Sequence, residues 1–228
     1  MSGTNQSNVA IVDDDASVRQ ALARLLRTAG HSVQTFGCAQ EFLQHPAIDD
    51  IGCLVLDVQL PDLNGLELQA ALEQLARAPA VVFISGYGDI PMTVRAMRAG
   101  AVDFLTKPCD AQVFLNAVAQ ALQVDNAQRS RQRELTAERT RLASLTQREH
   151  EVLRGIIMGL RNKQIAAELA ICEKTVKVHR AHIMDKMGVR SVAELVRLTE
   201  HAGADSGNSI TKKTSTEPQT HAHLCMQA

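Results

Sequence analysis

Hydrophobic and polar positions follow two patterns along the first 120 or so residues. Short strand-like runs occupy 8–12, 31–36, 51–56, 80–84 and 102–105, and the apolar run that closes at Asp57 predicts a buried parallel strand. The segments between and after them carry apolar residues three or four positions apart, which predicts helices. In the fifth of these helices the predicted inner face consists of Val113, Ala117, Val118, Ala121 and Leu122. Five strand–helix units in succession indicate an α/β fold: a doubly wound (βα)5 domain with a five-stranded parallel sheet.

The pattern changes near residue 124. Residues 125–143 are rich in Arg, Gln and Glu and contain no Gly or Pro, which predicts an exposed helical linker that extends the preceding helix. Residues 144–201 show helical spacing alone, with a capping box at Thr146 and Glu149, and predict a small all-α domain. Within it, a short helix, a turn and a longer helix over 173–187 fit a helix-turn-helix.

The remaining segments and the composition narrow the class of protein. Residues 203–228 contain almost no core-forming side chains, so we expect a disordered tail. No apolar run approaches the roughly 18 residues needed to span a bilayer, and the polar residues 1–8 do not resemble a signal peptide. The five cysteines are scattered without metal-ligand spacing, which fits a reducing compartment. We therefore expect a cytoplasmic protein with no membrane partner.

The net charge of −1 conceals two halves of opposite sign. Residues 1–124 hold seven Lys and Arg against thirteen Asp and Glu, whereas residues 125–201 hold fifteen against ten. A basic helical half is a candidate for nucleic-acid binding. Ordinary variation between solvated surfaces would produce the same balance, so charge alone does not decide the function.

Polar side chains follow four of the predicted strands. Asp57 closes one apolar run, Asp13 and Asp14 close another, and Ser85 and Lys107 follow two more. The carboxyl ends of parallel strands meet at one edge of a sheet, where open α/β folds place their chemistry. We therefore expect these five side chains to lie together.

This group of residues can bind Mg²⁺ and accept a phosphoryl group. Asp13 and Asp14 offer the oxygen ligands that Mg²⁺ prefers, and Asp57 would complete the site and act as acceptor, with the cation neutralising the phosphoryl oxygens. Ser85 can donate to one phosphoryl oxygen and Lys107 can pair with another. Each residue alone has an ordinary explanation, such as a helix-dipole interaction for the acids, a surface lysine or a satisfied loop hydroxyl.

Residues 8 to about 123 resemble the receiver domain of bacterial two-component response regulators. The matching segments are IVDDD at 11–15, LVLDVQLPDLNG at 54–65, VVFISGYGDI at 81–90 and FLTKP at 104–108. The resemblance implies that a sensor histidine kinase phosphorylates Asp57, and that the backbone carbonyl of Gln59 joins the three acids as a Mg²⁺ ligand.

The same resemblance assigns roles to residues near the last strand. Ser85 and Lys107 would contact the phosphoryl group, and Phe104 would be the switch aromatic that turns inward when Ser85 moves. A plain core phenylalanine is compatible with the same position. The bond between Lys107 and Pro108 matches one that is often cis in this family.

The longer helix of the predicted helix-turn-helix has a basic face. Lys174, Lys177 and Arg180 recur at helical spacing, whereas the residues expected to pack inward are Val176, Ile183 and Met187. A helix of this width fits the major groove of DNA. An ordinary solvated amphipathic helix would show the same periodicity.

Residues 144–200 resemble the LuxR-type helix-turn-helix of FixJ/NarL regulators over nearly their whole length. The resemblance implies that the helix after Ser191 mediates dimerisation on DNA, that Lys177 and Val178 reach bases, and that the DNA backbone is contacted by Lys163, Lys174, Thr175 and Arg180. Within the family the chain is most similar to the FixJ branch and resembles StyR- and TodT-like regulators.

Together these features predict a DNA-binding transcriptional response regulator. Phosphorylation of Asp57 would promote homodimerisation and binding to double-stranded operator DNA, RNA polymerase would be a further candidate partner, and the receiver would dephosphorylate itself slowly rather than act as an enzyme. An aspartyl-phosphate phosphatase usually carries an acid two residues after its nucleophile, where this chain has Gln59. A phosphate-independent DNA binder would not need the complete set of acid-site residues.

Overall fold

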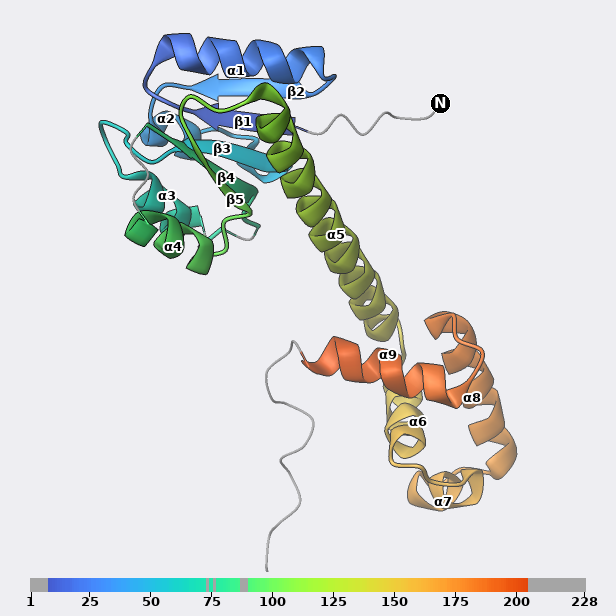
Figure 1. The fold of residues 1–228 in the computed structure, drawn as a ribbon. Coiled ribbons are helices and arrows are strands. Elements are labelled where there is room, and N and C mark those ends of the chain that lie inside the picture. The colour runs from blue at the N-terminus through green and yellow to red at the C-terminus, as the bar shows by residue number, and fades with distance from the viewer. Residues whose placement is uncertain (1–7, 73, 76, 87–89, 205–228) are drawn as a thin grey trace, which may run out of the picture. The chain divides into compact units, whose positions relative to one another are not determined.

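The structure is a computed structural model that describes residues 8–72, 74–75, 77–86 and 90–204 (Figure 1). The chain divides into two compact units, 1–131 and 132–228. Helix α5 (Ala111–Ala143) continues through this boundary, as the sequence of the linker predicted. The predicted disordered tail lies outside the described residues from 205 onward, and residues 203 and 204 belong to helix α9 (Val192–Ala204).

The first unit is built on a five-stranded parallel sheet with the strand order β2-β1-β3-β4-β5. Each predicted strand is present, and its observed bounds differ from the predicted range by at most two residues. The strands are β1 (Asn8–Val12), β2 (Ser32–Phe36), β3 (Cys53–Asp57), β4 (Ala80–Ser85) and β5 (Asp103–Thr106).

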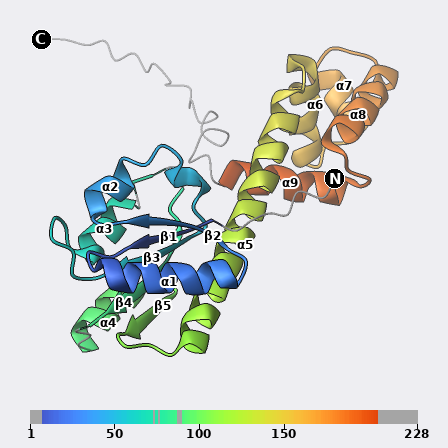
Figure 2. The same ribbon diagram turned by 90° about the horizontal axis from the view of Figure 1, so that it is seen from above.

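Alternate residues of the central strands face two separate hydrophobic cores. On β1, Val9 and Ile11 pack with α1 (Ala16–Thr28) and α5, whereas Ala10 and Val12 pack with the helices of the opposite face. Figures 1 and 2 show the helices on the two sides of the sheet. Because both faces are covered, the central strands β1, β3 and β4 are apolar along most of their length. The opposite face carries α2 (Ala39–Leu43), α3 (Gly65–Leu72) and α4 (Ile90–Arg98).

Helix α5 presents a slightly different face to the core from the one that its sequence spacing suggested. Val113, expected on the inner face, is 50% exposed, and Phe114 is fully buried in its place. Phe114, Ala117, Val118 and Ala121 lie at the three- and four-residue spacing of one helical face, and all four are buried. Val113 is one position, about 100° of helix rotation, away from that face.

The first residue of the predicted linker, Asp125, is buried in the first unit. Asp125 is 2% exposed, and its carboxylate accepts hydrogen bonds from Arg129 Nε at 2.7 Å and from Arg77 Nη2. Arg129 also donates to the carbonyl of Asp50, at the end of the 3₁₀ turn η1 (Ile48–Asp50), at 3.0 Å. Asp125 therefore departs from the expectation of an exposed linker, because two arginines pair with its charge.

After α5, the described residues of the second unit form four helices around one core. Helices α6 (Gln147–Ile157), α7 (Asn162–Glu168) and α8 (Glu173–Met187) precede α9. Val176, Ile183 and Met187 of α8 are fully buried, which confirms the predicted inward face. Gly188 ends α8 in the left-handed region at φ 68°, a conformation that favours glycine.

The capping box predicted at the start of α6 is present and extends into an ion pair. Thr146 Oγ1 accepts from the Glu149 backbone N–H at 3.3 Å, and Glu149 Oε2 accepts from the Thr146 N–H at 2.8 Å. Glu149 is only 3% exposed, and Lys186 Nζ lies 2.7 Å from its Oε2. This carboxylate therefore ties the start of α6 to the end of α8.

We expect Asp125→Ala to lower the free energy of unfolding of the first unit by about 1–3 kcal/mol, because two partly buried arginines would lose a charged acceptor. Urea denaturation followed by circular dichroism measures the change. Glu134→Ala, an exposed position on the same helix, is the control and should shift stability by less than about 0.5 kcal/mol. Equal stability of the two variants would contradict the role assigned to Asp125.

Stability of the second unit should fall in acid because of Glu149. The hydrogen bonds from Lys186 and Thr146 lower the pKa of Glu149 from 4.5 to about 2. A folded-state pKa below the unfolded value gives stability that is complete above about pH 4.5 and is lost as the pH falls towards about 2. The melting temperature of wild type should therefore exceed that of Glu149→Gln at neutral pH, and the gap should narrow in acid. A gap that does not change with pH would count against this account.

Cys172 occupies the N-cap of α8, and within the described structure its side chain accepts no hydrogen bond from the helix backbone. We expect Cys172→Ser to raise the stability of the second unit by about 0.5–1 kcal/mol, because a hydroxyl oxygen caps better than a thiol. Cys38→Ser is the matched control. Cys38 is the N-cap of α2, but the first amides of α2 are already bound by Asp62. A melting temperature that is unchanged or lower in Cys172→Ser would contradict the prediction.

Candidate functional site

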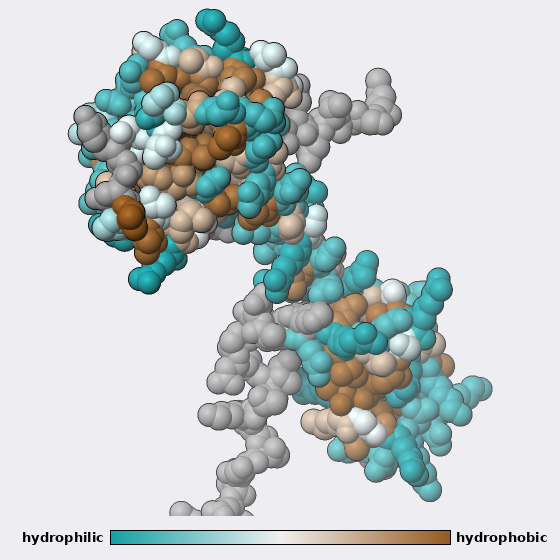
Figure 3. All heavy atoms as spheres, viewed as in Figure 1, coloured by the Kyte–Doolittle hydropathy of each residue, from teal (hydrophilic) through white to brown (hydrophobic). Residues whose placement is uncertain are grey.

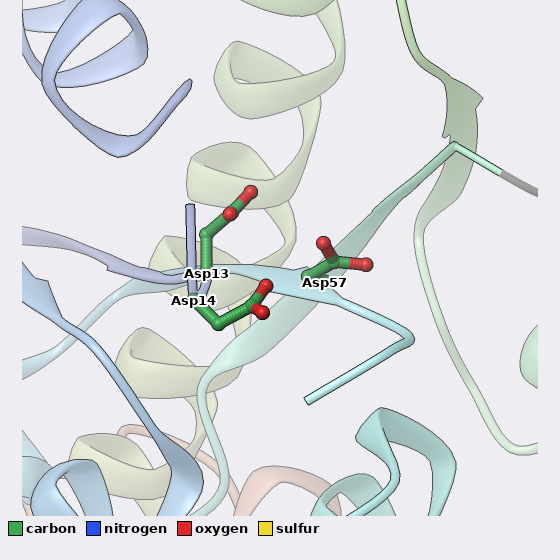
Figure 4. Close-up of side chains that lie close together, drawn as sticks. All are labelled: Asp13, Asp14 and Asp57. Atoms are coloured by element: carbon green, nitrogen blue, oxygen red, sulfur yellow. The ribbon is translucent and has the colours of Figure 1, made fainter. Parts of the chain in front are cut away.

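Three carboxylates converge at the carboxyl edge of the sheet. Asp13 and Asp14 follow β1, Asp57 ends β3, and each offers an oxygen within 4.8 Å of the others (Figure 4). Asp13 is fully buried, Asp57 is 6% exposed and Asp14 is exposed. The structure thus brings together the acids that the sequence placed at two strand ends, and leaves one of them open to solvent.

Lys107 lies between two of these acids. Its Nζ is 2.6 Å from Asp13 Oδ2 and 2.6 Å from Asp57 Oδ2. Burial raises the pKa of Asp13, and Lys107 partly offsets this effect. Burial favours a lower pKa for Lys107, but the bonds to the two acids outweigh it and the pKa is raised. The lysine therefore stays charged, and the described cluster of three carboxylates and one ammonium keeps an excess of negative charge.

Ser85 and Phe104 lie on the two neighbouring strands. Ser85 ends β4 and is fully buried, and its carbonyl accepts from the Lys107 N–H at 2.7 Å. Phe104 on β5 is half-buried, with its ring centroid 6.0 Å from that of Phe83. The bond between Lys107 and Pro108 is cis. Phe104 thus packs in the core. This position is compatible with a switch aromatic and with a plain core phenylalanine, the two roles considered from the sequence.

The third acid of the run, Asp15, is separate from this cluster. Its Oδ1 accepts from the N–H groups of Ser17 at 2.8 Å and Val18 at 3.3 Å, so it caps α1. The hydrogen bonds to these amides lower its pKa. The ordinary explanation for the acids, a helix N-terminus, therefore holds for Asp15, and Asp13 and Asp14 contribute to the cluster.

Gly65 is a site residue that the sequence did not single out. A Cβ at this position would lie 2.4 Å from the backbone oxygen of Asp57, closer than atoms can approach. Its N–H donates to the carbonyl of Val58 at 2.9 Å. Glycine therefore allows α3 to start directly against the end of β3. The only signal in the sequence was a glycine just after the cap residue Asn64, which is common in loops.

The backbone after Asp57 turns towards its side chain. The N–H of Gln59 donates to Asp57 Oδ1 at 3.0 Å, and the Gln59 side chain is exposed. Asp57 is thus held from two sides, by Lys107 on one oxygen and by this amide on the other. The cluster can bind a divalent cation and can present one carboxylate oxygen to an electrophile.

The predicted DNA-contacting side chains lie on the surface of the second unit. Lys174, Lys177 and Val178 on α8 and Lys163 on α7 are exposed, and Val178 is 47% exposed. Thr175 and Arg180 are half-buried. Thr175 Oγ1 lies 3.0 Å from Cys172 Sγ. Lys174 and Lys177 therefore face solvent, whereas Arg180, four residues after Val176 and three before Ile183, lies beside the buried face of α8.

Two protein families match the chain. The response regulator receiver domain matches residues 9–119, and the luxR family of bacterial regulatory proteins matches residues 143–199. Within the part of the chain that the structure describes, no helix is both long and apolar enough to cross a membrane. The two matched segments together span both compact units.

Two related proteins are similar to this chain over most of its length. Nodulation protein W of Bradyrhizobium diazoefficiens is 45% identical over 201 residues, which cover 88% of each chain. Response regulator protein TodT of Pseudomonas putida is 45% identical over 194 residues, 85% of this chain and 86% of TodT. Both identities are high enough to show common descent along the full two-domain length.

Solved structures agree with these relatives. The response regulator StyR is 50% identical, covers 86% of this chain and 98% of its own, and superposes with a TM-score of 0.78. Full-length FixJ from B. japonicum is 37% identical, with 88% and 99% coverage and a TM-score of 0.53. This chain belongs to the DNA-binding transcriptional response regulators of two-component systems, which join a receiver domain to a LuxR-type helix-turn-helix domain.

Proposed function

We propose that Asp57 is the phosphoacceptor of this response regulator and that a sensor histidine kinase is the donor. In the transfer, the bond from phosphorus to a histidine nitrogen breaks and a bond from phosphorus to an Asp57 oxygen forms. The observation that carries the proposal is the convergence of Asp13, Asp14 and Lys107 on the Asp57 carboxylate. Gln59 stands where an aspartyl-phosphate phosphatase has its acid, and an amide cannot donate a proton to a leaving group.

The acid cluster fits Mg²⁺. Asp13, Asp14 and Asp57 supply hard oxygen atoms within 4.8 Å of one another, and we assign the carbonyl of Gln59 as a further ligand. A bound Mg²⁺ neutralises charge on the phosphoryl oxygens. Lys107 would then pair with a phosphoryl oxygen as a point charge, and the Ser85 hydroxyl would donate to another. Phe104 would turn inward as Ser85 moves.

An apolar stripe on α4 supports dimerisation of the phosphorylated receiver. Ile90, Val94 and Met97 are 81%, 41% and 44% exposed, and their spacing of four and three residues places them on one helical face. Figure 3 shows hydrophobic atoms at the surface of the first unit. Exposed apolar patches of this kind mark interaction sites, and we assign this face, with β5 and the start of α5, to a symmetric homodimer.

The second unit would bind double-stranded operator DNA. In this proposal Lys177 and Val178 reach base edges, and the phosphate backbone is contacted by Lys163, Lys174, Thr175 and Arg180. Helix α9 would pair two copies on two half-sites, so that dimerisation joins two modest contacts into a tight one. RNA polymerase is a candidate partner of the bound dimer.

The proposed functions divide along the chain. Residues 8–124 would receive the phosphoryl group, residues 125–143 would link the domains, and residues 144–201 would bind DNA in the cytoplasm, where the chromosome lies. The receiver would return to its resting state by slow hydrolysis of its own acyl phosphate. Residues 203–228 have no assigned role.

Asp57→Asn should abolish the gain in DNA affinity that phosphorylation produces. A genome-derived fragment is first selected with wild type treated with acetyl phosphate and Mg²⁺. Affinity for it is then measured at fixed salt, because phosphate contacts are salt-dependent. Wild type should gain about tenfold or more and become dimeric, whereas Asp57→Asn should not respond.

Asp49→Asn is the matched control, because Asp49 is an exposed carboxylate outside the cluster; this variant should respond as wild type does. Equal responses of wild type and Asp57→Asn would show that phosphorylation of Asp57 does not control DNA binding.

A further inference from the structure

Helix α2 is capped by Asp62, which lies 23 positions after Ala39, the first residue of the helix. Among the described residues, its N-cap Cys38 makes no side-chain hydrogen bond to the helix. The N–H of Ala39 instead donates to Asp62 Oδ1 at 3.2 Å, and the N–H of Gln40 donates to Asp62 Oδ2 at 2.8 Å. Each carboxylate oxygen thus binds one amide, and these bonds lower the pKa of Asp62.

Asp62 lies in the loop that connects the acceptor strand to α3. At the start of this loop, the N–H of Gln59 holds Asp57 Oδ1. At its end, Asn64 caps α3: Asn64 Oδ1 accepts from the Leu66 N–H at 2.9 Å. Between these two points Asp62 attaches the loop to a different part of the fold. If only its two ends were held, the loop would have more conformational freedom than it has with Asp62 also attached to α2.

The turn that Asp62 binds also contacts the other half of the acid cluster. The N–H of Asp13 donates to the carbonyl of Phe36 at 3.3 Å, and Phe36 ends β2 three residues before Ala39. Residues 36–40 therefore hold Asp13 on one side and the loop of Gln59 on the other. The two segments that carry the cation ligands share this one support.

We propose that Asp62 is a positioning residue for the cation site of the receiver. Its carboxylate holds the loop against α2, and this fixes the carbonyl of Gln59 and the side chain of Asp57 relative to Asp13. The inference rests on the proposed function of Asp57, because it concerns the same cation site. The described acids close enough to share a cation are Asp13, Asp14 and Asp57, so Asp62 acts through the loop.

The binding of Mg²⁺ is sensitive to how firmly this loop is held. This ion demands nearly octahedral geometry at short distances, so a loop that moves by a fraction of an ångström weakens its binding. Residues that orient metal ligands typically contribute tenfold or more to affinity. A cap that stabilised α2 alone would lower the melting temperature and leave the affinity of the folded protein unchanged. The two roles therefore differ in a measurable way.

The test is a titration of the full-length chain with Mn²⁺, an oxygen-preferring ion whose free form has a strong electron paramagnetic resonance signal. Asp62→Ala should bind Mn²⁺ about tenfold more weakly than wild type, at a temperature where both are folded. Asp62→Asn keeps one acceptor oxygen and should fall between them. With acetyl phosphate as donor, Asp62→Ala should need more Mg²⁺ for half-maximal phosphorylation and reach a similar maximal rate.

Glu41→Ala is the matched control. Glu41 Oε2 accepts from the Gly37 N–H at 2.9 Å, so this change removes a bond at the same turn without touching the loop. It should leave Mn²⁺ affinity as in wild type. If Asp62→Ala binds Mn²⁺ with an affinity within about twofold of wild type, the role of Asp62 is overturned, whatever the melting temperature of the variant, and the proposed cation site still stands. A wild type that binds no Mn²⁺ would overturn the proposed cation site and the inference together.

Discussion

One ammonium group pairs with two of three carboxylates that meet at the edge of a buried sheet. Lys107 lies 2.6 Å from both Asp13 and Asp57, and without it two nearly buried negative charges would face each other. Buried charges are stable only when they are paired and hydrogen-bonded. The lysine compensates part of the negative charge, and the remainder attracts a cation or the positive end of a reacting group.

The rest of the receiver keeps these groups in place. The parallel sheet brings the strand ends to one edge, although helices separate these ends in the sequence. The apolar central strands β1, β3 and β4 are covered by helices on both faces. Gly65 lets α3 start against the backbone of Asp57, and the turn at 36–40 supports both Asp13 and the loop after Asp57. The chemistry thus depends on backbone contacts that contribute no reacting group.

Much of this arrangement could be predicted from local patterns. Strand-like runs predicted the five strands, and Thr146 and Glu149 marked the start of α6 correctly. The convergence of Asp13, Asp14 and Asp57 followed from the strand order of parallel sheets. These features depend on neighbours close in sequence, or on topological rules that hold for every such sheet.

The features that were missed depend on contacts made only in the folded chain, two of them with residues distant in sequence. The burial of Asp125 requires Arg77, 48 residues away, and the cap of α2 comes from Asp62 rather than from the residue before the helix. Val113 and Phe114 differ by one helix position, and spacing alone did not decide which one faces the core. A sequence pattern shows which side chains are apolar or charged, but the pairing of charges needs the folded chain.

The most direct test of the account is to locate the phosphoryl group itself. The full-length protein would be treated with acetyl phosphate and Mg²⁺, reduced with borohydride to convert an acyl phosphate into an alcohol, and digested for peptide mass spectrometry. The account predicts homoserine at position 57 and unmodified aspartate at 13, 14 and 62. Reduction at another aspartate, or no reduction in a protein that retains its native fold, would contradict it.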